Sequence, residues 1–233
     1  MIRMDGRLRC AFDMLQGAER VADIGCDHGK LTIALLQEGG CKRLIAGDIS
    51  SDCLEKTRRI VSRYGFQSKA EVRLGDGLSI LAPGECDGAA ILGMGGELIA
   101  HMLQSSPAVA ESLERLVLQP MSGIEELRQW LFKNGYHVRE DRLVADGSRW
   151  YQLFCVQKGR FPDPWPEGFP AECFLVGYRS FMDGDRLLGQ YCEMLRHKRV
   201  VQLRQAAGTT GEAKLSREVC QLSKIIEEVE KWK

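Results

Sequence analysis

The stretch that decides the fold is Val21-Ala22-Asp23-Ile24-Gly25-Cys26-Asp27-His28-Gly29-Lys30. Its first four residues are typical of a buried strand, Gly25 permits a sharp turn, and the apolar run over residues 31–36 favours a helix. A strand, a glycine turn and a helix in this order form the first unit of a nucleotide-binding α/β sheet. The N-terminus of such a helix offers free N–H groups to a ligand.

The turn departs from the dinucleotide fingerprint. That fingerprint requires Gly-x-Gly-x-x-Gly, whereas here Asp27 stands where its carboxylate would repel a pyrophosphate. Asp48 ends the second expected strand, where an acid binds the hydroxyls of a ribose. These acids favour a cationic nucleoside without phosphates, and S-adenosylmethionine, with its ribose and its sulfonium, fits that description. A nicotinamide dehydrogenase is disfavoured for the same reason.

Composition sets limits on partners and location. The 32 Lys and Arg residues balance the 32 Asp and Glu residues, so a nucleic-acid partner requires a local basic patch. Nine cysteines without a Cys-x-x-Cys pair argue against a disulfide framework and a structural zinc, and we expect no metal. The sequence contains neither a signal-peptide core nor an apolar run of membrane-spanning length, which predicts a cytoplasmic protein with no membrane partner.

Strand and helix patterns alternate over residues 21–157. They predict an α/β fold with a Rossmann-like, mostly parallel sheet of seven strands covered by helices on both faces. The last two strands, 137–144 and 150–157, are joined by a short turn, so the hairpin should add an antiparallel edge strand. Helix caps are expected at Asp5, at Ser50 or Ser51, and in a capping box formed by Ser122 and Glu125.

A second domain is expected after residue 160. Residues 159–170 contain four of the seven prolines and mark a boundary between a domain over 1–160 and a helical hairpin over 171–233. The hairpin should pack through a coiled-coil seam whose apolar residues recur at steps of three and four. The residues of this seam are Leu187, Tyr191, Met194, Val201, Leu215, Val219, Leu222, Ile226 and Val229.

Acidic residues and glycines gather where the apolar strands end. Because the carboxyl ends of parallel strands meet at one edge of a sheet, we expect a cofactor site there. Asp48 would accept hydrogen bonds from ribose, Asp76 from an adenine amino group, and Asp27 would face the cationic end. Asp27 as an N-cap and Asp76 as an Asx turn remain structural alternatives. The predicted cofactor residues are Asp23, Gly25, Asp27, Asp48, Ile49, Gly75, Asp76, Gly77, Gly93, Met94, Gly95 and Gly96.

Motifs in a fixed order carry a resemblance to one family. They are Val21-Ala22-Asp23-Ile24-Gly25-x-Asp27-His28, Ile45-Ala46-Gly47, Gly75-Asp76-Gly77-Leu78, Gly93-Met94-Gly95-Gly96-x-Leu98-Ile99, Leu116-x-Leu118-Gln119-Pro120, Arg128-x-Trp130-Leu131 and Tyr151. The chain resembles the bacterial tRNA (adenine-N1)-methyltransferases that act on adenine 22, the TrmK type. The resemblance covers residues 7–160 in sequence and the C-terminal hairpin in architecture. It implies a class I S-adenosylmethionine-dependent fold and a coiled-coil domain that grips tRNA.

The chemistry of methyl transfer and the distribution of charge suggest roles for individual residues. Asp27 is the first candidate and His28 the second for the catalytic group that steadies the cationic base. Lys30 and Met121 stand where the family has an aromatic residue and an asparagine. The predicted substrate and tRNA contacts are Arg7, Lys30, Gln119, Arg196, Lys198 and Arg199. Two alternatives stay open: a methyltransferase of small molecules or another RNA with the C-terminal helices as a lid, and a non-catalytic S-adenosylmethionine-binding protein. The oligomeric state also stays open.

Overall fold

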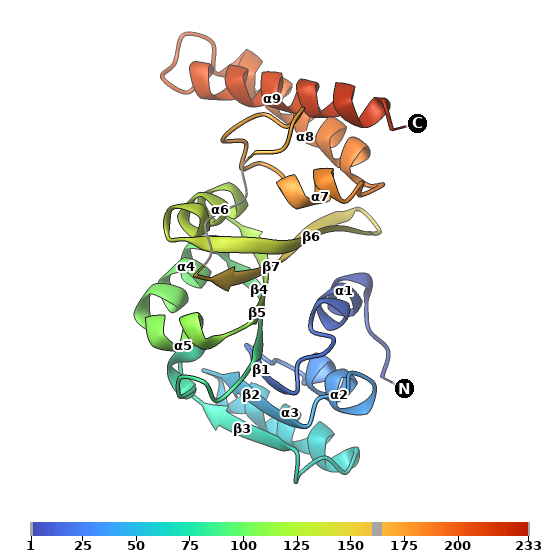
Figure 1. Cartoon of the computed structure of the whole chain (residues 1–233), viewed down its shortest axis with the longest axis vertical. Helices are drawn as coiled ribbons and strands as arrows, with labels where there is room; N and C mark the ends of the chain where they lie inside the picture. Colours follow the sequence, from blue (N-terminus) through green and yellow to red (C-terminus); the bar gives the residue numbers. More distant parts are fainter. Residues whose placement is uncertain (1, 160–164, 233) are drawn as a thin grey trace.

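A seven-stranded sheet with helices on both faces forms the larger part of the molecule (Figure 1). The computed structural model describes residues 2–159 and 165–232, so Pro162 and Pro164 of the expected boundary lie outside the described residues. The strands follow the order β3-β2-β1-β4-β5-β7-β6. They are β1 (Arg20–Ile24), β2 (Arg43–Asp48), β3 (Ala70–Leu74), β4 (Gly88–Gly95), β5 (Arg115–Ser122), β6 (Tyr136–Asp146) and β7 (Arg149–Lys158).

Strand order reverses between β1 and β4, and the predicted first unit lies at this point. β1 pairs in parallel with β2 on one side and with β4 on the other. Ligands of open α/β sheets bind outside the carboxyl ends of the strands at such a reversal. β7 runs antiparallel to both β5 and β6, so the expected antiparallel pairing is found at this edge of the sheet.

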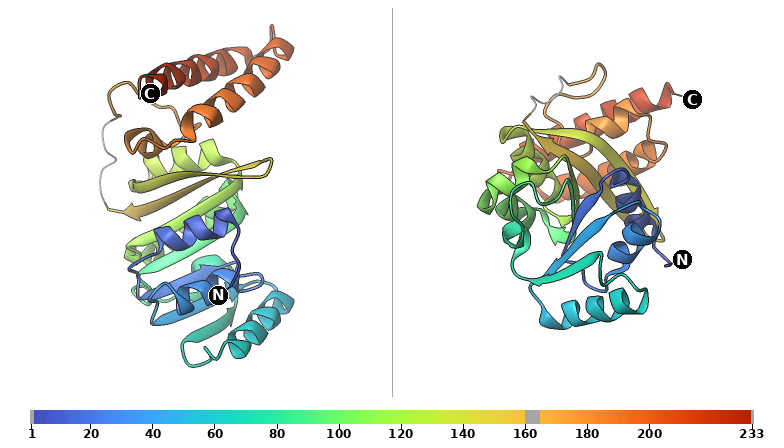
Figure 2. Two further views of the ribbon diagram at one scale, coloured as in Figure 1. Left: turned by 90° about the vertical axis from the view of Figure 1, so that its right-hand side faces the viewer. Right: turned by 60° about the horizontal axis from the view of Figure 1, so that its bottom comes forward.

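The helices divide between the two faces of the sheet (Figure 2). Because side chains alternate along a strand, Ala22 and Ile24 contribute to one apolar cluster and Val21 to the other. The first cluster packs η1 (Gly77–Ile80), α4 (Gly96–Ser105), α5 (Pro107–Ser112) and α6 (Ile124–Lys133). The second packs α1 (Gly6–Met14), α2 (Lys30–Gln37) and α3 (Ser51–Arg63).

Two of the three expected helix caps form. The Asp5 carboxylate accepts a hydrogen bond from the Leu8 N–H, and the Ser50 hydroxyl accepts one from the Cys53 N–H. The capping box at Ser122 is wrong. Ser122 remains in β5, where it pairs with Gly95, and α6 begins after Gly123 in the left-handed conformation without a side-chain cap. Strand pairing therefore takes Ser122 out of the cap position.

The C-terminal helices stand on the β6 edge of the sheet (Figures 1 and 2). They are α7 (Tyr178–Met182), α8 (Leu188–Gln205) and α9 (Glu212–Glu230), of which α8 and α9 lie side by side. Leu222 and Ile226 of the expected seam are buried, whereas Val201 is 41% exposed, so its placement in the seam is wrong. At this level Arg199 of α8 instead forms an ion pair with the buried Glu218 of α9.

A buried polar network joins these helices to the sheet. Arg128 of α6 donates hydrogen bonds to the Asp141 carboxylate of β6 and to Gln152 of β7. Gln152 in turn donates to the Leu175 carbonyl and to the Tyr191 hydroxyl of α8. A buried charged pair that loses one partner leaves an uncompensated charge, so this network holds the helices in one orientation.

Candidate active site

A cavity of about 610 Å³ opens at the carboxyl ends of β1 and β2, beside the end of β4. It contains nine of the residues predicted from the sequence, which come from four separate segments of the chain. These residues are Arg7, Asp23, Gly25, Asp27, His28, Lys30, Asp48, Gly93 and Met94. The remaining lining residues are Asp5, Leu8, Cys26, Leu31, Cys53, Leu92, Met121, Arg149 and Tyr151.

Asp23 is the buried acid of this cavity. It is 4% exposed and accepts a 2.7 Å hydrogen bond from Thr32 Oγ1 at the first turn of α2. Burial raises the pKa of its carboxyl to about 6, the Thr32 hydrogen bonds oppose the shift, and the Asp48 and Asp27 charges add to it. Burial therefore destabilises the ionised form of Asp23, and a cationic ligand in the cavity would stabilise it.

The loop from Gly25 to Gly29 is held against α3. Thr57 Oγ1 donates a 3.1 Å hydrogen bond to the Asp27 carbonyl and lies 3.4 Å from Cys26 Sγ. Asp27 has a φ of 45°, a left-handed conformation that non-glycine residues rarely adopt. Its side chain is 66% exposed, points to the cavity and lies 3.5 Å from His28 Nε2. Asp27 does not cap α2, whose N-cap is Gly29.

Gly25 has a backbone conformation that favours glycine. Its φ is 75°, in the left-handed region that L side chains rarely adopt. A Cβ at this position would also displace the end of the Met94 side chain, which lines the cavity.

Asp48 closes the cavity at the end of β2. One of its carboxylate oxygens accepts a 2.8 Å hydrogen bond from the Ser50 N–H, which leaves the other for a ligand hydroxyl. The Gly75 N–H donates to the Asp48 carbonyl at 3.1 Å, so the end of β3 lies beside this acid. Ile49 and Asp76 are exposed near this point but do not line the cavity.

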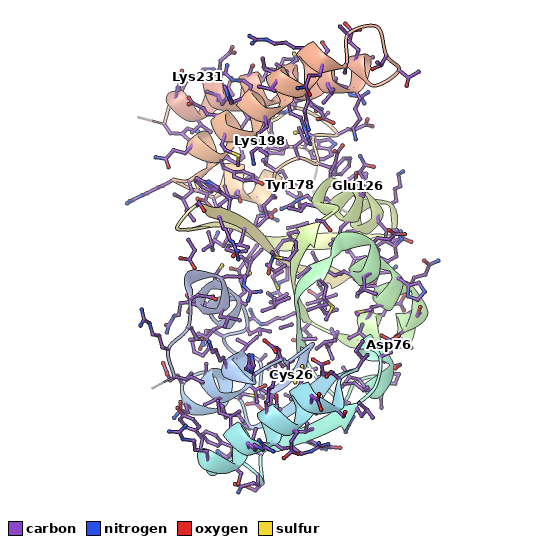
Figure 3. The ribbon with its side chains drawn as sticks, turned by 180° about the vertical axis from the view of Figure 1, so that it is seen from behind. Cys26, Asp76, Glu126, Tyr178, Lys198 and Lys231 are labelled. Atoms are coloured by element: carbon purple, nitrogen blue, oxygen red, sulfur yellow. The ribbon has the colours of Figure 1, made fainter. Side chains whose placement is uncertain are left out.

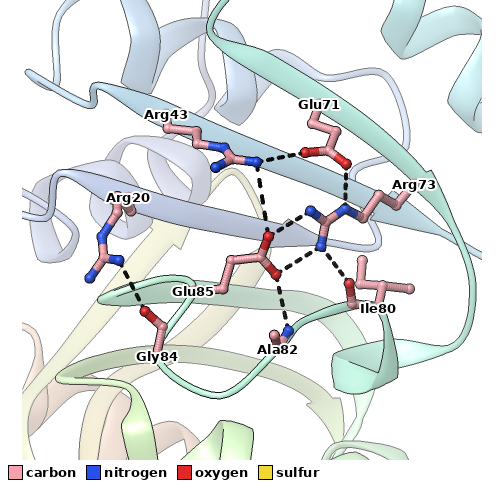
Figure 4. A network of polar contacts seen from close by, with 8 residues as sticks. All are labelled: Arg20, Arg43, Glu71, Arg73, Ile80, Ala82, Gly84 and Glu85. Carbon is pink, nitrogen blue, oxygen red and sulfur yellow. Dashed lines mark hydrogen bonds and ion pairs between the residues drawn. The ribbon is translucent and has the colours of Figure 1, made fainter.

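A charged network braces the ends of β2 and β3 from behind (Figure 4). Arg73 donates two hydrogen bonds to the Glu85 carboxylate and one to the Ile80 carbonyl. Arg73 holds the pKa of Glu85 down at about 2. Ile80 packs so tightly over Gly47 and Gly75 that a Cβ on either glycine would collide with it. The network thus ties β3 to the end of η1, and Ile80 there packs against the glycines that precede Asp48 and Asp76.

Gln119 holds Arg7 and Gly93, which line the opposite wall of the cavity. This side chain is fully buried, and its Oε1 accepts hydrogen bonds from Arg7 Nη1 at 3.0 Å and from the Gly93 N–H at 3.2 Å. The Arg7 guanidinium also lies 5.8 Å from the centre of the Tyr151 ring. Gln119, predicted as a substrate contact, instead lies behind the cavity and orients Arg7 toward it.

Six polar or polarisable lining residues were absent from the predicted site. They are Asp5, Cys26, Cys53, Met121, Arg149 and Tyr151. Arg149 and Tyr151 begin β7, far along the chain from the other lining residues, and only the family motif pointed to Tyr151. Local sequence carries no signal for Arg149, because the pairing of β7 with β5 and β6 delivers it to the site.

Several predicted residues lie away from the cavity. Gly95 and Gly96 line a separate groove beside α6, and a Cβ on Gly96 would collide with the Gly123 carbonyl, so Gly96 serves helix packing. The cations Arg196, Lys198 and Arg199 belong to α8, at the far end of the molecule from Cys26 (Figure 3). Gly77 is buried against Met102.

Within residues 2–159 and 165–232, no group of three or more His, Cys, Asp or Glu side chains is arranged to hold a metal ion. In the same part of the chain, no helix is long and apolar enough to cross a bilayer.

The fold and the site define a Rossmann-like protein of the methyltransferase class, with an acidic cavity at the strand-order reversal. A family model described as a methyltransferase domain matches residues 4–154, well over half of the chain. The chain belongs to this methyltransferase domain family and, within it, to the TrmK group, as the sequence motifs predicted.

Named relatives place the chain in this group over its whole length. The tRNA (adenine(22)-N(1))-methyltransferase of Bacillus subtilis is 28% identical, over 98% of this chain and 97% of that protein. The crystal structure of the B. subtilis M1A22 tRNA methyltransferase TrmK is 26% identical and has a TM-score of 0.78, with 99% of each chain covered. M. capricolum TrmK, solved with S-adenosyl-homocysteine, shares the fold at a TM-score of 0.79 with 20% identity, over 97% of this chain and 98% of that one.

Proposed function

We propose that this protein transfers the methyl group of S-adenosylmethionine to N1 of adenine 22 in tRNA. One observation carries the proposal: a single cavity holds three carboxylates, Asp23, Asp27 and Asp48, beside Arg7 and Tyr151. Carboxylates suit a ribose and a positive sulfur, while an arginine and an aromatic ring suit a nucleotide. The full-length similarity to the B. subtilis enzyme supports the choice of adenine 22.

The residues of the cavity fit S-adenosylmethionine. Gly25 lets the Met94 side chain lie against the turn, where a Cβ would displace it, and the second Asp48 oxygen is available to ribose hydroxyls. Asp23 and Asp27 supply negative charge for the cationic end. Gly75 and Asp76, beside Asp48, would meet the adenine of the cofactor.

The cofactor supplies an already activated methyl group, so the protein contributes mainly alignment. N1 of adenine has a free lone pair once the base is released from pairing, and it becomes accessible once the base leaves its stack, so the nucleotide is extruded into the cavity. Tyr151 and Arg7 would hold the base there. Asp27, exposed to the cavity, would stabilise the cation that forms or accept an amino proton, with His28 as the second candidate. Lys30 would contact the phosphate beside the extruded base.

The two parts of the chain have separate tasks in this proposal. Residues 1–160 bind the cofactor and carry out the transfer, and residues 171–233 grip the tRNA away from the site. Arg196 and Lys198 on α8 are available for phosphate, whereas Arg199 is paired with Glu218. All nine cysteines are free thiols, which suits the reducing cytoplasm where tRNA is found.

The alternative of a lid over a small substrate receives no support from the site. Of the C-terminal residues that the structure describes, 165–232, none lines the cavity. The apolar space between α6 and residues 165–178 measures about 30 Å³, room for only one or two water molecules. The described residues therefore leave no room for a substrate between α6 and residues 165–178.

The test is mass spectrometry of nucleosides from a tRNA transcript incubated with the protein and methyl-labelled S-adenosylmethionine. We expect one labelled 1-methyladenosine per tRNA, lost when adenine 22 is replaced by guanine. Calorimetric binding of S-adenosylmethionine without methyl transfer would identify a non-catalytic binding protein. Label at another position would retain the enzyme class and refute adenine 22.

A further inference from the structure

A second, larger groove adjoins the active-site cavity. It has a volume of about 970 Å³ and lies between the N-terminal segment, residues 2–6, and one face of α3. Asp5, His28 and Lys30 line both the groove and the cavity, so the two spaces are continuous. Figures 1 and 2 show that this region, beside α2 and α3, lies at the opposite end of the molecule from α8 and α9.

The groove is strongly basic in a chain whose total charge is zero. Five Lys or Arg side chains line it against two aspartates, and one of these, Asp5, already caps α1. The five basic residues are Arg3, Lys30, Lys56, Arg59 and Arg63. The three from α3 recur at helical spacing, so Lys56 and Arg63 are separated by about 10 Å along one face of the helix.

Most of these basic side chains lack the carboxylate partners that other basic residues of the domain have. On the described part of the chain, Arg3, Lys30, Lys56 and Arg63 form no ion pair, and Arg59 pairs only with Glu55. By contrast, Lys42 pairs with Glu19, and Arg43 with Glu71. Unpaired cations gathered in a concave surface create a positive potential that attracts an extended anion.

The groove also offers surface for bases. Ile60 and Tyr64 lie on the same face of α3 as the cations, and both are partly buried. Single-stranded nucleic acid binds where a basic channel follows the backbone and an aromatic ring stacks on a base.

We propose that the groove binds the phosphodiester backbone of the tRNA nucleotides that flank the methylated adenosine. This inference rests on the proposed function and extends it by assigning a path across the protein to the RNA strand around the methylated adenosine. The flanking nucleotides pass between the N-terminal segment and α3, and Lys30 lies where this path meets the cavity. The C-terminal helices contact a distant part of the same tRNA.

The experiment compares two double variants with the same change of charge. Lys56→Gln with Arg63→Gln neutralises the groove, and Arg58→Gln with Lys69→Gln neutralises two exposed cations that do not line it. The measurements are the dissociation constant for full-length tRNA at several salt concentrations, and calorimetric binding of S-adenosylmethionine. The second measurement confirms that each variant is folded.

For the groove variant we expect tRNA affinity to fall about tenfold or more, and the slope of log K against log salt to flatten by about 1.4–1.8. Cofactor affinity should stay unchanged, and the control should keep the wild-type slope. An equal loss in both variants, or an unchanged slope in the groove variant, would overturn the proposal.

Failure of this inference differs from failure of the proposed function. If the wild-type protein methylates tRNA while the groove variant binds like the control, only the groove assignment is wrong. If the groove variant loses tRNA binding but the wild-type protein makes no 1-methyladenosine, the groove stands and the proposed reaction is wrong.

Discussion

Thr32 Oγ1 donates a 2.7 Å hydrogen bond to Asp23 Oδ2 in the buried wall of the cavity. This bond links the end of β1 to the first turn of α2, and it partly offsets the burial that raises the Asp23 pKa to about 6. In the unfolded chain this group titrates near 3.8. Between these pH values the folded protein binds more protons than the unfolded chain, so the stability of the free protein falls as pH rises through this window.

Cofactor binding should therefore be coupled to a proton. A cationic ligand favours the ionised Asp23, so affinity should rise with pH through about 6 and then level off. Calorimetry at pH 5.5 in buffers of different ionisation enthalpy should detect release of most of one proton, and at pH 7.5 almost none. Asp23→Asn should abolish this release and weaken binding. Equal release from the wild type and the variant would assign the proton to another group.

Turnover measurements can distinguish the catalytic roles of Asp27 and His28. The two side chains lie 3.5 Å apart, but only a carboxylate can stabilise a cationic base through its negative charge. Asp27→Asn keeps the shape of the side chain and should lower the single-turnover rate at saturating cofactor by about 10²-fold. His28→Ala should lower this rate less than tenfold. The opposite order would make His28 the catalytic group.

Gly25 and Gly40 form a matched pair for testing whether the Gly25–Met94 contact shapes the cofactor site. Both have a left-handed backbone, with φ of 75° and 71°, but a Cβ on Gly40 meets nothing within 4 Å. Each change to alanine should cost about 1–2 kcal/mol of stability through backbone strain. Only Gly25→Ala should also reduce cofactor affinity, and adding Met94→Ala should recover part of it. Equal cofactor affinity in the two single variants would show that Met94 and Gly25 do not shape the cofactor site.

Gln119 is expected to be a positioning residue that acts through Arg7. Gln119→Leu removes the acceptor shared by Arg7 and the Gly93 N–H and leaves both unpaired, at a cost of about 1–3 kcal/mol. Methyl transfer should slow while the dissociation constant of S-adenosylmethionine stays within a factor of three. Gln119→Glu restores the acceptor but loses the Nε2 donation to the Pro120 carbonyl, so it should recover only part of the rate, whereas a variant that lost only stability would show no such rescue.

The Arg73–Glu85 brace predicts a specific acid sensitivity. Because the folded-state pKa of Glu85 is lowered from 4.5 to about 2, its ionic bonds stabilise the protein above pH 4.5 and are lost as pH falls toward 2. Glu85→Gln should lower the unfolding free energy at pH 7 by about 1–3 kcal/mol. The difference from the wild type, measured by urea unfolding, should shrink as pH falls through this range. A difference in unfolding free energy that stays constant with pH would contradict the lowered pKa assigned to Glu85.

Much of the fold follows from local patterns. Short apolar runs that end in Gly or Asp predicted the strands, and the helices between them imposed parallel pairing, which the structure shows with a reversal beside β1. The acidic ends at Asp23, Asp27 and Asp48 could be predicted to meet, because the carboxyl ends of parallel strands share one edge. Asp5 was predictable as a cap, since its bond to Leu8 spans only three residues.

The errors arose where a distant partner outweighed the local pattern. Ser122 has the spacing of a cap but pairs with Gly95 in the sheet, and Val201 has the spacing of a seam residue but yields to the Arg199–Glu218 ion pair. Gln119 is polar at a strand end, yet strand packing buries it behind Arg7.

Local sequence is enough to specify an α/β sheet, the glycine turn after β1 and the acidic character of the site, because each depends on residues close together in the chain. Long-range packing, by contrast, brings Arg149 and Tyr151 into the cavity and places Arg3 across a groove from Lys56 and Arg63. These sets combine residues from distant segments, and only the packing of α1, α3 and the β6–β7 hairpin against one sheet brings them together.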